Sequence, residues 1–239
     1  MSADPFRHHP GLRGLVTPRA ESFFADFTPD KVRDLMRNKG LDTSWTLPEA
    51  EREADRAATL AGRDGDLWVF AYGSLMWDPG VAFAELRRAH APGVARRFIL
   101  YDDRGGRGSP EAPGVLAALD TGDGCDGLVF RIAAADVPRE SYSLWSRERI
   151  GPAYRSVFLP VETAQGQVQA LAFLADHEAE MIRPDLSHAD QVRLLATGHG
   201  ILGTARAYLE NLAAHFAQMG IDAPEVARLM RDVAAHDVR

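Results

Sequence analysis

Two short stretches of the chain carry residue types that could perform chemistry on a small molecule. The first is YGSL, residues 72–75, which interrupts an apolar run with small residues. Successive backbone N–H groups around a glycine can form an anion-binding concavity, and Gly73 permits backbone conformations that other residues avoid. A plain turn at the end of a strand is the alternative interpretation, so the motif alone does not decide.

The second stretch contains one carboxyl group, Glu148. If residues 137–150 form a helix, Glu148 lies on the same mostly apolar face as Ser141, Leu144 and Trp145, because the four residues fall at i, i+3, i+4 and i+7. A carboxyl on such a face loses hydration, which raises its pKa toward the range useful for proton transfer. The sequence therefore indicates Glu148 as an acid–base candidate.

The arginines beside Glu148 leave a second interpretation open. Helical geometry turns Arg147 and Arg149 away from the Glu148 direction by about 100° each. On the alternative view, SRER is a solvated charged run that closes a helix, and Glu148 has no chemical role.

Other chemistries find less support. Ser74 follows a strand-like run on a sharp turn, but its surroundings read YGSLM and lack the GxSxG pattern of serine hydrolases. Cys125 sits beside acidic residues that would raise its pKa. The chain contains neither GxxxxGK[ST] nor HExxH, and its glycine-rich segment 104–114 lacks GxGxxG spacing. We therefore expect no metal site and no cofactor.

Composition narrows the class of partner. The chain has 239 residues, a net charge of −7 and a sequence pI of about 5.6, whereas nucleic-acid binding needs a basic surface. The N-terminal residues carry prolines and charges where a secretory signal needs an apolar core, and no run is long enough for a membrane span. The expectation is a cytoplasmic monomer or small homo-oligomer that binds neither nucleic acid nor membrane.

The elements that must position these residues change type along the chain. Residues 1–65 are expected to form a helical N-terminal extension, with helices over 28–37 and 47–61, and residues 66–239 the main domain. Six strand-like runs follow, with the 137–150 helix between the fourth and fifth, and then helices to the end. The expected runs are 67–71, 96–102, 115–120, 128–134, 156–162 and 168–176. This order predicts an α+β fold around a mixed β-sheet or small β-barrel, with flanking helices and a helical C-terminal tail.

Four motifs in this order resemble a known family. WVFAYGSLMWDP (68–79), RGSPEAPG (107–114), LWSRE with a tyrosine six residues after the glutamate, and GILGTARAYL (200–209) are similar to those of the ChaC-type, glutathione-specific γ-glutamylcyclotransferases. The resemblance covers about residues 66–230. It implies a mixed sheet or barrel that cleaves glutathione to 5-oxoproline and Cys-Gly without water or cofactor.

The resemblance also assigns roles to individual residues. It implies that Glu148 is catalytic and that the loop holds the γ-glutamyl group through Ala71, Tyr72, Gly73, Ser74, Leu75 and Met76. Arg107 is a candidate for a glutathione carboxylate and Tyr154 for the pocket wall, with plain structural roles as their alternatives. The nucleophile is then the substrate's own α-amine, so Ser74 would bind rather than attack.

Two departures and two further functions stay open at this point. Ala71 stands where the family commonly has glycine, and Ser109 where it has threonine. A cyclotransferase of the same fold could act on other γ-glutamyl amino acids or amines. A non-catalytic, metabolite-binding regulator of transport is possible too, although such a protein has no need of a desolvated carboxyl.

Overall fold

A seven-stranded mixed sheet forms the centre of the chain in a computed structural model, which describes residues 3–25 and 27–236. The sheet has the order β2-β5-β1-β7-β4-β3, and β6 pairs with β7 beside this path. β7 runs parallel to β1 and β4, and the other pairs are antiparallel. The strands are β1 Leu67–Ala71, β2 Glu85–Ala91, β3 Val94–Asp102, β4 Gly114–Thr121, β5 Cys125–Ile132, β6 Tyr154–Val161 and β7 Val168–Ala175, and a small hairpin joins β8 His199–Gly200 to β9 Gly203–Thr204.

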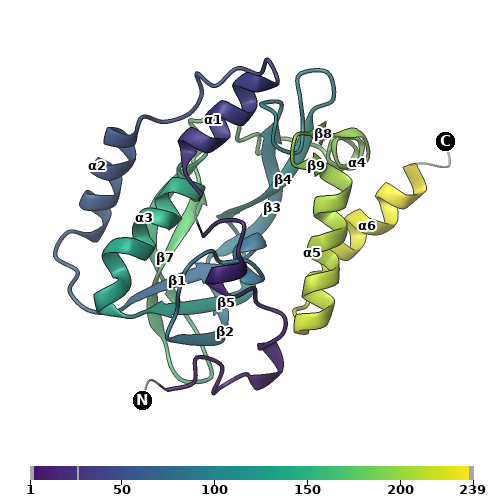
Figure 1. Cartoon of the computed structure of the whole chain (residues 1–239). Coiled ribbons are helices and arrows are strands. Elements are labelled where there is room, and N and C mark those ends of the chain that lie inside the picture. Colours follow the sequence, from purple (N-terminus) through teal and green to yellow (C-terminus); the bar gives the residue numbers. More distant parts are fainter. Residues whose placement is uncertain (1–2, 26, 237–239) are drawn as a thin grey trace.

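Six helices flank the sheet in two groups (Figure 1). One group holds α1, α2 and α3, and the other is a bundle of α4, α5 and α6 whose members contact one another. None of the described helices combines the length and apolar character needed to cross a bilayer. Their bounds are α1 Pro29–Asn38, α2 Glu49–Leu60, α3 Val137–Glu148, α4 His188–Thr197, α5 Ala205–Met219 and α6 Pro224–His236.

The predicted mixed sheet with flanking helices is confirmed, and the sheet is open rather than a closed barrel. Within the described residues, the only backbone pairing between β2 and the end of β6 is one isolated bridge, from His90 to Glu162, directly after β6. All six expected strands are present. β2 was not expected, since its sequence ELRRAHA carries two arginines and a histidine and does not read as an apolar run.

Helix α3 begins and ends close to its predicted limits. Pro138 occupies the first turn, where a missing N–H costs nothing, and Gly151 and Pro152 follow the end. Asp136 stands at the N-cap position, but its side chain makes no capping hydrogen bond and pairs with Arg139 instead. The sequence suggested Asp136 as the N-cap of this helix; the structure confirms the helix but not the capping hydrogen bond.

The apolar face of α3 packs on the sheet through Trp145. This ring is fully buried and meets Phe173 of β7 edge-on, with centroids 5.3 Å apart. An aromatic ring of this size contributes most of the apolar area that a short helix can bury. The contact fixes the rotation of α3 and therefore the direction in which its last residue, Glu148, points.

Candidate active site

The last turn of α3 and the loop after β1 come together at a small pocket of about 110 Å³. Glu148 lies at its wall, and three tyrosines surround it: Tyr72 from the loop, Tyr154 from the start of β6 and Tyr208 from α5. Elements distant in sequence thus converge on one carboxyl group. A concave site with few convergent polar groups is the usual form of a small-molecule site.

Glu148 keeps 15% of its side-chain surface exposed, so the expected burial of this carboxyl is confirmed. Burial raises the pKa of Glu148, and the charge and hydrogen bond of Arg147 oppose that rise. The net shift is upward from the ordinary value. A carboxyl with a raised pKa can both take and return a proton near neutral pH.

Arg147 does not point away from Glu148, so that expectation is wrong. Its Nε lies 3.0 Å from Glu148 Oε1, and its side chain is only 8% exposed. Nη2 donates to Ser74 Oγ at 2.8 Å, Nη1 donates to the Asp78 carbonyl at 2.6 Å, and the guanidinium lies 3.6 Å above the Phe24 ring. The helix ends here, so a long side chain can turn back across it.

The idea of a solvated SRER run is likewise excluded by the structure. Arg149 is 12% exposed, with Nε 3.3 Å from Asp55 Oδ2, and it donates to the Tyr154 carbonyl. Asp55 of α2 also accepts from Trp145 Nε1 at 2.6 Å and from Ser156 Oγ at 2.9 Å. One carboxylate from the N-terminal segment therefore holds the end of α3 and the start of β6 together.

The three tyrosines remain protonated at any physiological pH. Burial raises the pKa of Tyr208 to about 12 and also raises the pKa values of Tyr72 and Tyr154 well above the ordinary value, with the charge of Glu148 adding to each shift. Phenols that stay neutral can act as hydrogen-bond donors to a developing negative charge. Tyr208 lies within the quoted GILGTARAYL motif, but its spacing gave no sign that it would face Glu148.

The YGSL loop has a different geometry from the one expected. Gly73 has φ −136°, so it does not use the left-handed backbone region. A Cβ at this position would lie 3.8 Å from the Tyr208 hydroxyl and would occupy pocket space. The glycine therefore provides room rather than an unusual turn.

The amides of the loop divide into two kinds. Met76 N–H donates to the Gly73 carbonyl at 2.9 Å, within a single 3-10 turn over Ser74–Met76. Among the hydrogen bonds of the described residues, none uses the N–H groups of Ser74 or Leu75. Two neighbouring donors thus stay available at the pocket, as in an anion-binding concavity.

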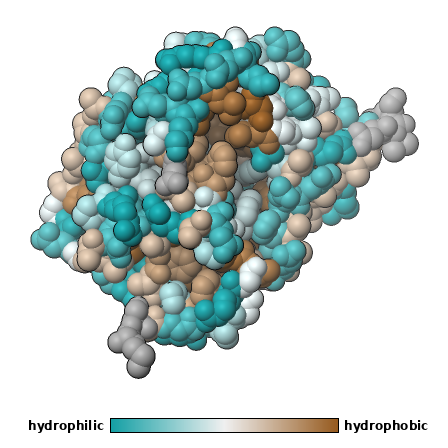
Figure 2. Space-filling view, in the orientation of Figure 1, coloured by the Kyte–Doolittle hydropathy of each residue, from teal (hydrophilic) through white to brown (hydrophobic). Residues whose placement is uncertain are grey.

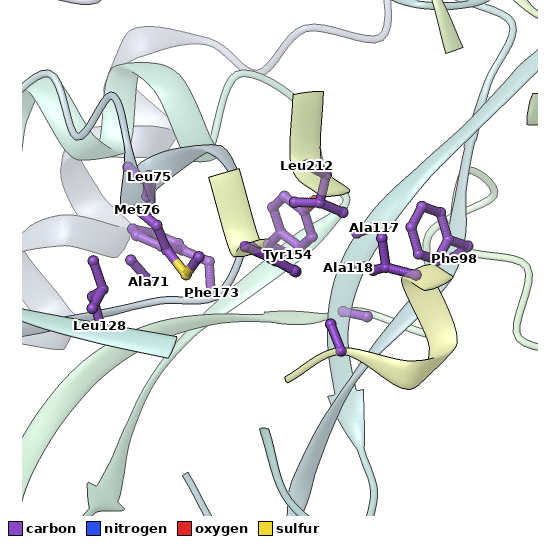
Figure 3. Packing of buried hydrophobic residues seen from close by; sticks show 14 of the residues in the cluster. Ala71, Leu75, Met76, Phe98, Ala117, Ala118, Leu128, Tyr154, Phe173 and Leu212 are labelled. Atoms are coloured by element: carbon purple, nitrogen blue, oxygen red, sulfur yellow. The ribbon is translucent and has the colours of Figure 1, made fainter. Parts of the chain in front are cut away.

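The predicted site residues separate into three locations. Tyr72, Gly73, Ser74, Leu75, Glu148 and Tyr154 line the small pocket. Ala71 and Met76 are fully buried below it and lie beside Phe173 and Leu128 in the core (Figure 3). The structure therefore brings six of the expected residues together and leaves these two as packing residues behind the loop.

Arg107 occupies the third location, outside the pocket lining. One of its guanidinium nitrogens approaches within 3.0 Å of the position that a Cβ on Gly203 would take, and it lies within electrostatic reach of Tyr208. Burial lowers the pKa of Arg107 from its high ordinary value. The charge of Asp102 opposes this shift, although no ion pair within 4.0 Å joins the Arg107 guanidinium to a carboxylate of the described residues.

Among the residues that the structure describes, neither of the two considered as nucleophiles, Ser74 and Cys125, has a partner that could activate it. Ser74 Oγ accepts from Arg147, a group that cannot remove its proton. Burial raises the pKa of the Cys125 thiol to about 11, with Glu225 and Asp126 adding and Arg96 opposing. Burial, rather than the acidic neighbours that the sequence suggested, is the main cause of the unreactive thiol.

A second and larger cavity adjoins the small pocket. It measures about 530 Å³ and shares Leu100, Leu116, Glu148 and Tyr154 with the pocket. Figure 2 shows apolar side chains gathered in a hollow between α1 and the β8–β9 hairpin, where this cavity reaches the surface. We refer to it as the apolar chamber.

Comparison with known proteins agrees with the geometry. The family model described as "ChaC-like protein" matches residues 67–236. A glutathione-specific gamma-glutamylcyclotransferase of Escherichia coli (strain K12) is 31% identical over 200 residues, which are 80% of this chain and 86% of that protein. The glutathione-specific gamma-glutamylcyclotransferase 1 of Homo sapiens is 30% identical over 175 residues, 70% of this chain and 78% of that protein.

A solved structure supports the fold. The crystal structure of a selenomethionine-labelled gamma-glutamyl cyclotransferase specific to glutathione from yeast superposes with a TM-score of 0.65. The match has 20% sequence identity and covers 72% of this chain and 97% of the yeast chain. At that identity the comparison speaks for the fold alone.

Proposed function

The chain belongs to the ChaC-like family, and from this membership we propose that it cleaves glutathione to 5-oxoproline and Cys-Gly. The single observation that carries the proposal is Glu148, a buried carboxyl with a raised pKa at the junction of the small pocket and the apolar chamber. The γ-glutamyl group fits the pocket, and the scissile amide then lies beside Glu148.

The reaction needs no nucleophile from the protein. The substrate α-amine attacks the γ-carbonyl carbon, a five-membered ring closes, and the amide bond to cysteine breaks. Holding the two groups together converts the attack into an intramolecular step of high effective concentration. The protein has to fold the γ-glutamyl chain and move one proton.

Glu148 moves that proton in two directions. It takes the proton that the amine loses on attack and returns it to the nitrogen of the departing Cys-Gly. An ordinary glutamate, with a pKa of about 4.3, differs from an α-amine by about 3.5 units, or nearly 5 kcal/mol of uphill transfer. The burial that raises the pKa of Glu148 reduces this difference.

The groups around Glu148 receive the charges of the substrate. The free N–H groups of Ser74 and Leu75 are suited to the oxyanion that forms on the γ-carbon, and each such donor is worth about 2.7–4 kcal/mol where it has been removed. The neutral Tyr208 phenol can add a further donor. Arg107, desolvated and without an ion-pair partner in the described chain, is suited to a substrate carboxylate.

An assay of product formation tests the proposal. Purified protein is incubated with glutathione, γ-Glu-Ala and a γ-glutamyl amine, and 5-oxoproline and Cys-Gly are quantified. Glutathione is expected to yield both products in equal amounts. Release of 5-oxoproline only from the other two would select the broader cyclotransferase, and no 5-oxoproline from any of the three would rule out the enzyme. A cytoplasmic location, and a monomer or small homo-oligomer, stay predictions.

A further inference from the structure

The apolar chamber is larger than the leaving group of glutathione requires. Its 530 Å³ falls in the range of sites for drug-sized ligands, about 300–1,000 Å³, whereas Cys-Gly is a dipeptide of two small residues. In the proposed function the small pocket holds the γ-glutamyl part, so that part does not occupy the chamber. The chamber therefore has unused volume beyond the scissile bond.

Most of the residues that line this chamber are aromatic or aliphatic, and about a third of the lining comes from the N-terminal segment. The matched family range begins at residue 67, so only the part of the wall that comes from the N-terminal segment lies outside it. The main apolar side chains are Phe23, Phe24, Phe27, Leu35, Trp45 and Leu202. A thiol, an amide and a carboxylate gain little from such walls, because polar groups lose hydration there without new hydrogen bonds.

The mouth of the chamber is also apolar. Among the described residues only four large hydrophobic side chains are exposed, and three of them border this mouth: Phe23 at 67%, Leu35 at 43% and Leu202 at 49%. Exposed apolar side chains scattered singly are common, but a group around one opening marks a binding site.

One polar group inside the chamber lacks full pairing. The Nε of Arg104 is buried and has no hydrogen-bond partner, and its ion pairs with Asp103 and Glu180 are long, at 3.7 and 3.5 Å. Arg104 lines the chamber, so it can meet the glycine carboxylate of a bound tripeptide. Arg104 thus adds an incompletely paired cationic group to a chamber that Lys31 and Arg147 also line.

We propose that this chain turns over glutathione carrying an apolar group on its sulfur, an S-alkyl or S-aryl thioether, and binds it more tightly than glutathione. The inference rests on the proposed function and names its substrate class. The sulfur belongs to the cysteine that directly follows the scissile amide. With that amide at Glu148, a substituent on the sulfur therefore lies in the chamber. The α-amine attacks the γ-carbonyl, the amide C–N bond breaks, and Glu148 passes the proton to the leaving nitrogen. The products are 5-oxoproline and the S-substituted Cys-Gly.

Kinetics with glutathione and S-hexylglutathione test the proposal. Each methylene buried among apolar side chains contributes about fourfold to binding, and the chamber is partly open. We therefore expect a KM for S-hexylglutathione at least tenfold below that for glutathione, with 5-oxoproline formed from both. Turnover of glutathione without this advantage for S-hexylglutathione would overturn the inference and leave the proposed function intact. No 5-oxoproline from either compound would remove both.

Variants at the mouth locate the effect. Leu35→Asn combined with Leu202→Asn changes exposed side chains, so the fold should persist, and the ratio of the two KM values is expected to fall about tenfold toward one. Tyr142→Asn is the matched control, because Tyr142 is the fourth exposed large side chain and lies outside the chamber. A KM ratio that survives in the Leu35/Leu202 variant would contradict the assignment of the chamber.

Discussion

Two opposing effects set the charge state of Glu148. Burial disfavours the ionised carboxylate, while Arg147, 3.0 Å away, favours it. The arginine is itself fixed by Ser74 and by the Asp78 carbonyl. Arg147 therefore helps to keep Glu148 in the ionised form that accepts a proton, but it does not bring the pKa of Glu148 down to the ordinary value.

Glu148→Gln tests the proton-transfer role directly. The amide has nearly the same shape, so the fold should be retained, but it cannot accept a proton. Loss of a general acid–base group typically costs about 10²–10⁴-fold in rate. We expect 5-oxoproline formation to fall by that factor while the circular dichroism spectrum is unchanged. A variant with normal turnover would exclude Glu148 from the mechanism.

The pH dependence of turnover reports the same group. Only the ionised form of Glu148 can act as a base, so kcat/KM should decrease as pH falls through its raised pKa. Arg147 lowers that pKa, so Arg147→Gln is expected to move the acid limb to higher pH. The substrate amine titrates identically in both assays, and the difference between the two profiles therefore isolates Glu148. An unshifted or lower limb would contradict the ion pair as the controlling contact.

Ser74→Ala distinguishes a supporting hydroxyl from a nucleophile. The change removes one hydrogen bond to a charged group, which is worth about 1.5–3 kcal/mol at most. We expect steady-state turnover to fall by no more than about 100-fold. Removal of a serine nucleophile costs on the order of a millionfold in serine proteases, so a loss of that size would restore Ser74 as the attacking group.

Among the residues of the site, the sequence predicted side-chain positions correctly where the regular repeat of an α-helix determines them. The spacing of Leu144, Trp145 and Glu148 predicted the buried carboxyl, because an α-helix repeats regularly. It did not predict that Arg147 folds back, because the helix stops at that point and the side chain follows local partners. Tyr208 was missed because a tyrosine on a helix 60 residues later carries no signal of what it faces.

A single arginine connects three elements at the scale of strands and helices. Arg96 of β3 is 7% exposed and donates to the Tyr72 carbonyl at 2.7 Å and to the Asp126 carbonyl at 2.8 Å. It also pairs with Glu225 of α6 at 2.7 Å. The carbonyl before Gly73 is therefore held by the sheet and, through Glu225, by the C-terminal bundle.

Arg96→Met should loosen this connection. Two hydrogen bonds from a charged group to carbonyls are lost, at about 1.5–3 kcal/mol each, so we expect the free energy of unfolding to fall by about 3–6 kcal/mol in denaturant titrations. The KM for glutathione is expected to rise as well, because the YGSL loop is less fixed. Glu225→Gln is the matched control, because it weakens only the ion pair between Arg96 and the partly exposed Glu225 and leaves both carbonyl contacts of Arg96 in place. Equal effects of both variants would place the role in the bundle contact.

Element prediction succeeded where a run is apolar and failed where polarity hides a strand. β1 was predicted with its observed bounds, since LWVFA is apolar throughout and is buried on both faces. β2 was missed because Arg87, Arg88 and His90 interrupt its apolar pattern, and its pairing with β5 comes from the tertiary fold. The barrel expectation failed for a similar reason, since local sequence does not encode whether two distant strands meet.

At the scale of the whole molecule, aromatic residues of the N-terminal segment pack closely against two glycines of the rest of the chain, Gly80 and Gly151. A Cβ on Gly151 would lie 2.8 Å from the Trp45 ring, and one on Gly80 would lie 2.7 Å from Phe24 Cβ. The Leu47 N–H also donates to the Ile150 carbonyl at 2.9 Å. The division into an extension of residues 1–65 and a domain of residues 66–239 stays a prediction. These contacts hold Phe24 and Trp45 in the wall of the chamber that adjoins Glu148.

Gly151→Ala tests this seating. The added methyl displaces Trp45, so residues 19–63 should be cut faster in limited trypsin digestion, and the unfolding temperature should fall by several degrees, as a loss of about 1 kcal/mol implies. Gly14→Ala is the control, because nothing lies within 4 Å of a Cβ there. Equal digestion of both variants would mean that Trp45 does not hold the segment.

Docking of the N-terminal segment has a consequence for synthesis of the chain. Phe24 and Trp45 are translated before their partners at Gly80 and Gly151, and Arg19 is translated before its partner Glu140. These residues are therefore synthesised well before the native contacts that hold them can form. Until α3 has been translated, a cluster of phenylalanines is open to other nascent chains, which is the condition under which chaperones become necessary.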